Sequence, residues 1–183
     1  MSSSDPASQH AAGSQVPDVI VRGKAAGFRQ EITSGAHRFE ADEPVALGGT
    51  DAAPTPYDYL LAALGSCTSM TVAMYARRMK WPLDDVTVGL RHSRIHAKDC
   101  ADCETKEGML DRIEMDVELT GDLSSEQRAK LMEIAHKCPV HRTMTKEIDI
   151  KVQEWKSQIP SSKHQEDRRG APVAAANGDA VGS

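Results

Sequence analysis

The first part of the chain alternates short apolar runs with glycine-containing turns. Runs of β-branched and aromatic residues are typical of strands, and glycine supplies the backbone freedom that the turns between them need. We therefore predict three short strands followed by a flexible loop at Gly48 and Gly49. The strands are expected at 19–21, 28–32 and 37–41.

The longest helical pattern follows this loop and covers residues 56–79. Thr55 suits the N-cap, Pro56 suits the first helical position, and Asp58 sits where a capping box needs an acid. Apolar residues spread over most sides of this helix, and such a helix must be buried on most sides. In a chain of 183 residues, a second copy of the chain is one way to bury it.

The second half of the chain predicts long strands and shorter helices. Apolar residues recur at every second position in two stretches, which is typical of half-buried strands. Ser124 and Gln127 form a capping box for a second helix, and Pro139 can open a short third one. Further strands are expected at 86–96, 112–119 and 148–152. The resulting order, β-β-β-α-β-β-α-α-β, indicates the α+β class and not a βαβ repeat.

Composition changes this picture at the two ends. Residues 1–18 and 156–183 are poor in apolar side chains and cannot bury enough surface to offset chain entropy. We expect them to be disordered tails on either side of one domain at 19–155. We see no internal repeat.

Charge and composition also exclude several classes of function. The net charge of −5 and the 4% aromatic content provide neither a basic stripe nor a stacking platform, so we expect no nucleic-acid partner. We find no run near the roughly 20 apolar residues of a membrane span and no apolar stretch of a secretory signal. We therefore expect a cytoplasmic protein with no membrane partner, whose cysteines are kept for chemistry rather than for structural disulfides.

Two cysteines stand in contrasting local patterns. Cys138 precedes Pro139, at or next to a helix N-cap, where backbone N–H groups stabilise a thiolate. His141 and Arg142 follow one turn later and add positive potential. Cys67 lies mid-helix on an apolar face, where burial favours an inert thiol, so local chemistry alone favours plain core packing for it. Sequence alone does not pair Cys67 with Cys138.

The other two cysteines lie close together, after two histidines. His92, His96, Cys100 and Cys103 are ligand types that zinc accepts, but a zinc site usually closes with two separated clusters. The alternatives are a CxxC redox pair without a thioredoxin-like context, or a polar hairpin tip with exposed thiols. The polar hairpin tip is favoured over the zinc site and the redox pair, which have similar weight, and we expect no cofactor.

Three sequence motifs resemble the OsmC/Ohr family. They are Gly48-Gly49-Thr50, the helix segment from Thr55 to Cys67, and the segment from Lys137 to His141. The two cysteine motifs, about 70 residues apart, are specific together although each is weak alone. The resemblance extends over the order of elements from about residue 28 to residue 152.

The resemblance implies an intertwined homodimer with long helices between two sheets. It also implies a thiol-dependent peroxidase acting on organic hydroperoxides or hydrogen peroxide. Cys67 would be the thiol that attacks the peroxide, and Cys138 would resolve the resulting sulfenic acid as a disulfide. An external dithiol would then reduce that disulfide.

Two departures from the family pattern bear on activity. Tyr57 stands where peroxidase members carry a glutamate, with Asp58 as the adjacent acid. The family's thiolate-stabilising arginine aligns with an alanine, so Arg22 and Arg29 are the nearby candidates. Without such a cation Cys67 would react slowly at neutral pH. The alternative function is therefore a non-catalytic dimer that binds a small apolar molecule or senses redox state.

Overall fold

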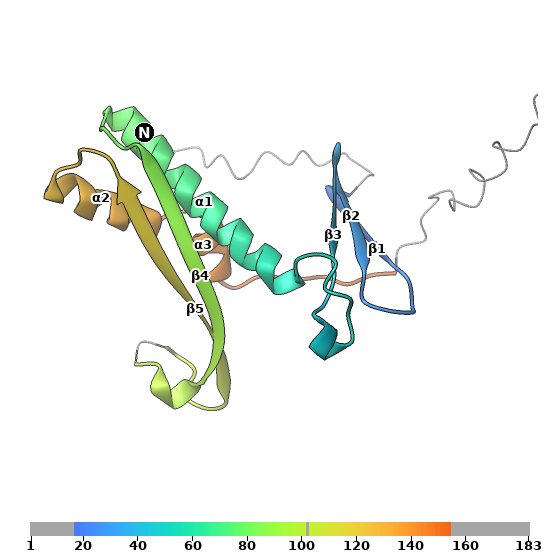
Figure 1. Ribbon diagram of the computed structural model, residues 1–183. Helices are drawn as coiled ribbons and strands as arrows, with labels where there is room; N and C mark the ends of the chain where they lie inside the picture. Colours follow the sequence, from blue (N-terminus) through green and yellow to red (C-terminus); the bar gives the residue numbers. More distant parts are fainter. Residues whose placement is uncertain (1–16, 102, 155–183) are drawn as a thin grey trace, which may run out of the picture. The chain divides into compact units, whose positions relative to one another are not determined.

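The computed structural model describes residues 17–101 and 103–154 (Figure 1). The chain divides into two compact units, Met1–Ile148 and Asp149–Ser183. The helices and strands of the described residues all belong to the first unit. The two predicted tails lie outside the described residues, apart from positions 17 and 18.

The predicted N-terminal strands form one antiparallel sheet in the order β1-β2-β3. Their bounds are Val19–Gly23 for β1, Gln30–Ser34 for β2 and His37–Ala41 for β3. Gly35 has a φ of 56° in the tight turn between β2 and β3, a conformation that glycine adopts without strain. The second strand begins two residues later than its sequence pattern indicated.

The long helix α1 spans Pro56–Met79, as predicted, and begins with the predicted capping box. The Thr55 hydroxyl accepts a hydrogen bond from the Asp58 N–H, and the Asp58 carboxylate accepts one from the Thr55 N–H. In the single chain, α1 buries one face only; its buried residues are Leu64, Gly65, Thr68, Val72 and Ala76. The burial expected on the other sides is therefore not supplied within one chain.

A two-stranded antiparallel sheet packs beside α1. Strand β4 (Asp85–His96) pairs with β5 (Met109–Thr120) along its whole length, from Asp85 opposite Thr120 to His96 opposite Met109. Gly65 allows the close approach, because a Cβ there would lie 2.7 Å from Cδ1 of Leu90. Both strands run longer than their alternation predicted, since antiparallel pairing continues into the polar ends.

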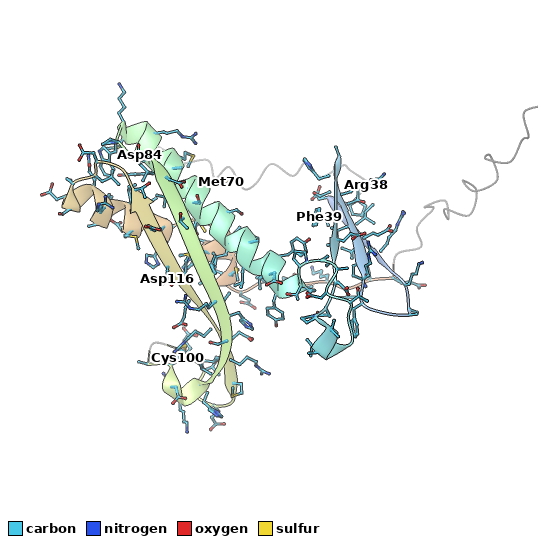
Figure 2. The ribbon with its side chains drawn as sticks, viewed as in Figure 1. Arg38, Phe39, Met70, Asp84, Cys100 and Asp116 are labelled. Carbon is cyan, nitrogen blue, oxygen red and sulfur yellow. A yellow bond between two sulfur atoms is a disulfide. The ribbon has the colours of Figure 1, made fainter. Side chains whose placement is uncertain are left out.

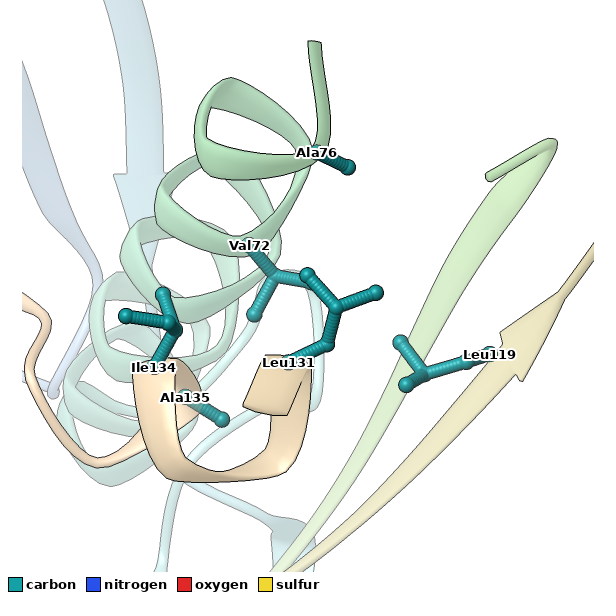
Figure 3. Close-up of a cluster of buried hydrophobic side chains, with 6 residues drawn as sticks. All are labelled: Val72, Ala76, Leu119, Leu131, Ile134 and Ala135. Carbon is teal, nitrogen blue, oxygen red and sulfur yellow. The ribbon is translucent and has the colours of Figure 1, made fainter. Parts of the chain in front are cut away.

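The core lies between α1, α2 (Ser125–Ala135) and β5 (Figure 3). Six side chains form it: Val72, Ala76, Leu119, Leu131, Ile134 and Ala135. The capping box of Ser124 and Gln127 that starts α2 is present as predicted. Helix α3 (Pro139–Met144) follows and contacts α1, which brings Cys138 back to the long helix.

One predicted element is wrong. Residues 148–152 form no strand, and the described residues 149–154 of the second unit contain no helix or strand. Ile148, Ile150 and Val152 are exposed, Val152 to 95%. Alternation alone predicted this strand, but a strand needs a neighbour to satisfy its backbone hydrogen bonds.

One helix has the length and composition of a membrane span. By length and composition alone, α1 could cross a membrane, with a mean hydropathy of 1.3 over 18 residues. The sequence inspection missed this because alanine, methionine and small hydroxyl residues dilute the run of strongly apolar side chains without lowering its average much. The same average suits a core helix of a globular protein.

Candidate functional site

The structure brings Cys67 and Cys138 together from two separate elements. Cys67 lies in the middle of α1, and Cys138 is the N-cap residue of α3. The two thiols are neighbours, since Cys138 and the backbone N–H of Val140 are both among the groups that shift the pKa of the Cys67 thiol. The structure therefore makes neighbours of two cysteines that the sequence alone did not pair.

The Cys138 sulfur accepts two hydrogen bonds. The Thr68 hydroxyl donates from α1 at 3.4 Å, and the backbone N–H of His141 donates from the first turn of α3 at 3.2 Å. Pro139 at the first helical position leaves Cys138 with extended backbone angles, and this directs its side chain back over the helix start. The sulfur of Cys138 is thus surrounded by donors.

The Cys67 thiol has a different environment. Burial raises its pKa above the ordinary value, and the neighbouring Cys138 thiol raises it further. The Val140 N–H and the Thr71 hydroxyl act in the opposite direction. Among the described residues, none of the groups that act most strongly on this thiol is a cation.

Exposure reverses the expectation from the sequence. Cys138 is completely buried, with 0% of its surface exposed, whereas Cys67 is partly exposed. The sequence pattern indicated a buried Cys67 because its helix is apolar on most sides. The single chain covers only one of those sides, and Cys67 lies at the edge of the covered face.

Two of the three candidate thiolate-stabilising groups, Arg29 and Asp58, interact with residues other than Cys67. One guanidinium nitrogen of Arg29, Nη2, donates to both carboxylate oxygens of Glu40, at distances of 2.8 and 2.7 Å. Asp58 caps α1 through Thr55, and its pKa is lowered by that hydrogen bond. It precedes Cys67 by nine residues, or about 13 Å along the helix axis. Arg22 is exposed on β1, opposite Glu31.

Tyr57 links the start of α1 to the β4–β5 sheet. Its ring stacks on His92 of β4 with centroids 4.6 Å apart, and Nε2 of His92 lies 3.0 Å from a carboxylate oxygen of Asp111. Tyr57 therefore takes part in a contact between elements at the position where a family glutamate was expected.

A cavity of about 350 Å³ lies between α1, β5 and the α2–α3 region. Its walls combine apolar and polar groups: Leu64, Asp111, Ile113, Met115, His136, His141, Met144 and Thr145. His136 and His141 meet edge to face with centroids 6.0 Å apart. His141 therefore lines this cavity and also donates its backbone N–H to the Cys138 sulfur.

The second pair of cysteines lies in the turn between β4 and β5, where Figure 2 labels Cys100. Cys100 and Cys103 are joined in a disulfide with a Cα–Cα distance of 5.4 Å. Both sulfurs that the zinc hypothesis needed are thereby used, and His92 instead contacts Tyr57 and Asp111. Within residues 17–101 and 103–154, no group of three or more metal-binding side chains comes together.

A family model described as OsmC-like protein matches residues 49–153, more than half of the chain. The chain belongs to the OsmC-like protein family. The matched range contains both Cys67 and Cys138, and the α+β fold class is confirmed.

Solved structures show the same fold as this OsmC-like chain. An OsmC-like protein from Mycoplasma pneumoniae is 17% identical, with a TM-score of 0.55, covering 69% of this chain and 85% of that one. An organic hydroperoxide resistance protein OsmC from Legionella pneumophila is 23% identical, with a TM-score of 0.52, covering 73% and 91%. An organic hydroperoxide resistance protein from Elizabethkingia anophelis is 21% identical, with a TM-score of 0.53, covering 69% of this chain and 86% of that one. No curated protein matches the chain.

Sequence reasoning missed one residue of the site in this OsmC-like chain. Thr68 is completely buried beside Cys67 and donates to Cys138, yet it looked like one of several hydroxyl residues in a helix. Its helical position was the available signal. It falls on the same face as Leu64 and Val72, and a buried hydroxyl on such a face needs a partner.

Proposed function

We propose that this OsmC-like protein is a thiol-dependent redox protein that reduces organic hydroperoxides or hydrogen peroxide. The observation that carries the proposal is the juxtaposition of the Cys67 and Cys138 thiols, which come from two elements about 70 residues apart. Two related structures bear the name organic hydroperoxide resistance protein, which agrees with this chemistry. The proposed location is the cytoplasm.

The reaction begins at the partly exposed thiol. The Cys67 thiolate attacks one peroxide oxygen, the O–O bond breaks, and the other oxygen leaves as an alcohol or water. Cys67 is left as a sulfenic acid. The Cys138 thiol then attacks that sulfur, releasing water and forming the Cys67–Cys138 disulfide. A dithiol reductant of unspecified identity returns both cysteines to thiols.

The electrostatics of the site favour a slow enzyme at neutral pH. Burial raises the pKa of Cys67, so only a small fraction of this thiol is ionised, and only the thiolate attacks peroxide. The ion pair of Arg29 with Glu40 and the capping of α1 by Asp58 occupy two of the groups considered for activation.

Mass spectrometry of peroxide-treated protein tests the proposal. One equivalent of cumene hydroperoxide should produce a Cys67–Cys138 disulfide within minutes, and Cys67→Ser should abolish it. The double variant Cys100→Ser/Cys103→Ser is the matched control, because it removes the other disulfide and should leave the reaction intact. Thiols that stay reduced while added glutathione is oxidised would contradict the proposal.

The assembly belongs to the same proposal. The exposed side of α1 carries large apolar side chains, including Met70 (labelled in Figure 2) and Met74, which are 70% and 60% exposed. An apolar stripe on a helix is covered in a stable protein, and the family resemblance implies a homodimer. A second copy of the chain is the proposed cover.

The cavity lined by His136 and His141 favours a second candidate function, the binding of a small molecule without turnover. Its volume of about 350 Å³ and its mixed apolar and histidine walls suit a ligand with an apolar body and a polar end. Peroxide consumption at the rate of the buffer alone, together with a ligand-dependent rise in melting temperature, would favour this function over catalysis.

A further inference from the structure

The two sulfurs of the thiol pair differ in access and in hydrogen bonding. The Cys138 sulfur is completely buried and accepts hydrogen bonds from Thr68 and from the His141 N–H. The Cys67 sulfur is partly exposed. The proposed reaction also requires a peroxide to reach the Cys67 sulfur.

We propose that the Cys67–Cys138 disulfide is reduced in one direction only, by attack of an external dithiol on the Cys67 sulfur, and that the Thr68 hydroxyl stabilises the departing Cys138. This inference rests on the proposed disulfide of the thiol pair. It goes beyond the proposed function by naming the sulfur that the reductant meets and a residue that acts in that step.

The electrons and protons balance through two exchanges. A thiolate of the dithiol attacks Cys67, the Cys67–Cys138 bond breaks, and the electron pair leaves with Cys138 as a thiolate. A mixed disulfide now joins Cys67 to the reductant. The second thiol of the reductant attacks its own bonded sulfur and releases Cys67. The reductant leaves as a disulfide, and its two protons end on Cys67 and Cys138.

Thr68 suits this role because of where its hydroxyl points. Neighbouring hydroxyls of α1 point elsewhere, Ser69 to the Val86 carbonyl and Thr71 to the Cys67 carbonyl. The Thr68 hydroxyl instead meets the Cys138 sulfur at 3.4 Å. A hydrogen bond to a sulfur strengthens as negative charge develops on it, which lowers the barrier for its departure.

Trapping with a monothiol tests the direction. The disulfide is formed with diamide in a Cys100→Ser/Cys103→Ser background, then opened briefly with glutathione and quenched with N-ethylmaleimide. A bound glutathione has no second thiol with which to release itself, and the quench blocks both the freed cysteine and the excess glutathione, so the mixed disulfide is kept for peptide mapping. We expect glutathione on Cys67 and maleimide on Cys138. Glutathione on Cys138 would overturn the inference, as would failure of diamide to join the two cysteines.

Stopped-flow reduction by dithiothreitol tests Thr68. Thr68→Val should open the disulfide about tenfold more slowly, since a hydrogen bond to a charged group is lost. Thr68→Ser keeps the hydroxyl and should stay within about twofold of the parent, and Ser69→Ala is the matched control with no expected change. A rate for Thr68→Val equal to the parent would overturn the role. Thr68→Ala serves as a second test if the valine variant unfolds.

Diamide makes this test independent of peroxide chemistry. If peroxide fails to oxidise Cys67 but glutathione still attaches to Cys67 after diamide, the proposed peroxidase fails and the directional inference stands. If peroxide forms the disulfide but glutathione attaches to Cys138, the proposed peroxidase stands and the directional inference fails.

Discussion

At the scale of single residues, Cys67 combines partial exposure with a pKa raised by burial. A thiol in this state can be reached by reagents, but only a small fraction of it is ionised near pH 7. Its reactivity should therefore be limited by ionisation and not by access.

This limitation predicts a steep pH dependence of alkylation. The rate at which iodoacetamide modifies Cys67 should rise steeply between pH 7 and 9, because the thiolate fraction grows as the pH approaches the raised pKa of this thiol. Mass spectrometry of the Cys138→Ser variant follows the modification of Cys67 alone. A rate that is flat over this range would mean that Cys67 is already ionised at pH 7.

Asp42 predicts a different pH effect, on stability. Its buried carboxylate accepts hydrogen bonds from the Thr50 hydroxyl and from the N–H groups of Glu43, Thr50 and Ala52, and these lower its pKa from the ordinary aspartate value to about 2. The folded state thus favours the ionised form, and this stabilisation is present above pH 4 and is lost as pH falls towards 2.

Asp42→Asn should therefore lower the melting temperature at pH 7, and the difference from the parent should shrink as pH falls from 4 to 2. Circular dichroism melts at several pH values measure it. Asp51→Asn, an exposed change in the same loop, should show no such convergence. An unchanged gap between parent and Asp42→Asn at pH 2 would contradict the assignment.

At the scale of elements, the start of α1 shows how far local sequence rules reach. Thr55, Pro56 and Asp58 predicted the first helical residue because capping depends only on neighbours in the chain. The strand expected at 148–152 failed because strand formation depends on a partner that sequence alternation does not contain.

The capping box gives a prediction at this scale. Thr55→Ala removes the side-chain acceptor for the Asp58 N–H and should cost about 1 kcal/mol of unfolding free energy. Urea denaturation measures this cost. Thr55→Ser keeps the hydroxyl and should recover most of the loss. Equal losses in both variants would indicate that the methyl group, rather than the hydroxyl, stabilises the helix start.

The same reasoning separates what could be predicted at the site from what could not. Cys138 as an N-cap followed from Pro139, a local signal. Its pairing with Cys67 depends on the packing of α3 against α1, so the residues alone left it open and only the family resemblance proposed it. The engagement of Arg29 by Glu40 depends on side-chain geometry near two strands, which no spacing rule encodes.

At the scale of the whole molecule, the exposed apolar stripe on α1 predicts self-association. Size-exclusion chromatography with light scattering should give a mass about twice the 19.8 kDa of the chain. A charged residue at the centre of the stripe, Met70→Glu or Met74→Glu, should yield monomers by placing an unpaired charge in the apolar interface.

Lys98→Glu is the control for this experiment, because it alters charge on an exposed turn of the hairpin away from α1. It should remain dimeric. A monomeric parent protein, or dimers that persist in both methionine variants, would show that another surface or no surface is used.

The disulfide of the β4–β5 turn has a practical consequence for counting sulfhydryls. The chain has four cysteines, of which Cys67 and Cys138 are free. When the isolated protein is unfolded with a chromogenic thiol reagent, it should release two equivalents of chromophore per chain. After reduction of the Cys100–Cys103 disulfide and removal of the reductant, it should release four. One equivalent of oxidant that joins Cys67 to Cys138 should lower the number of reactive thiols to zero. An absorbance reading therefore distinguishes this pair from the disulfide of the β4–β5 turn.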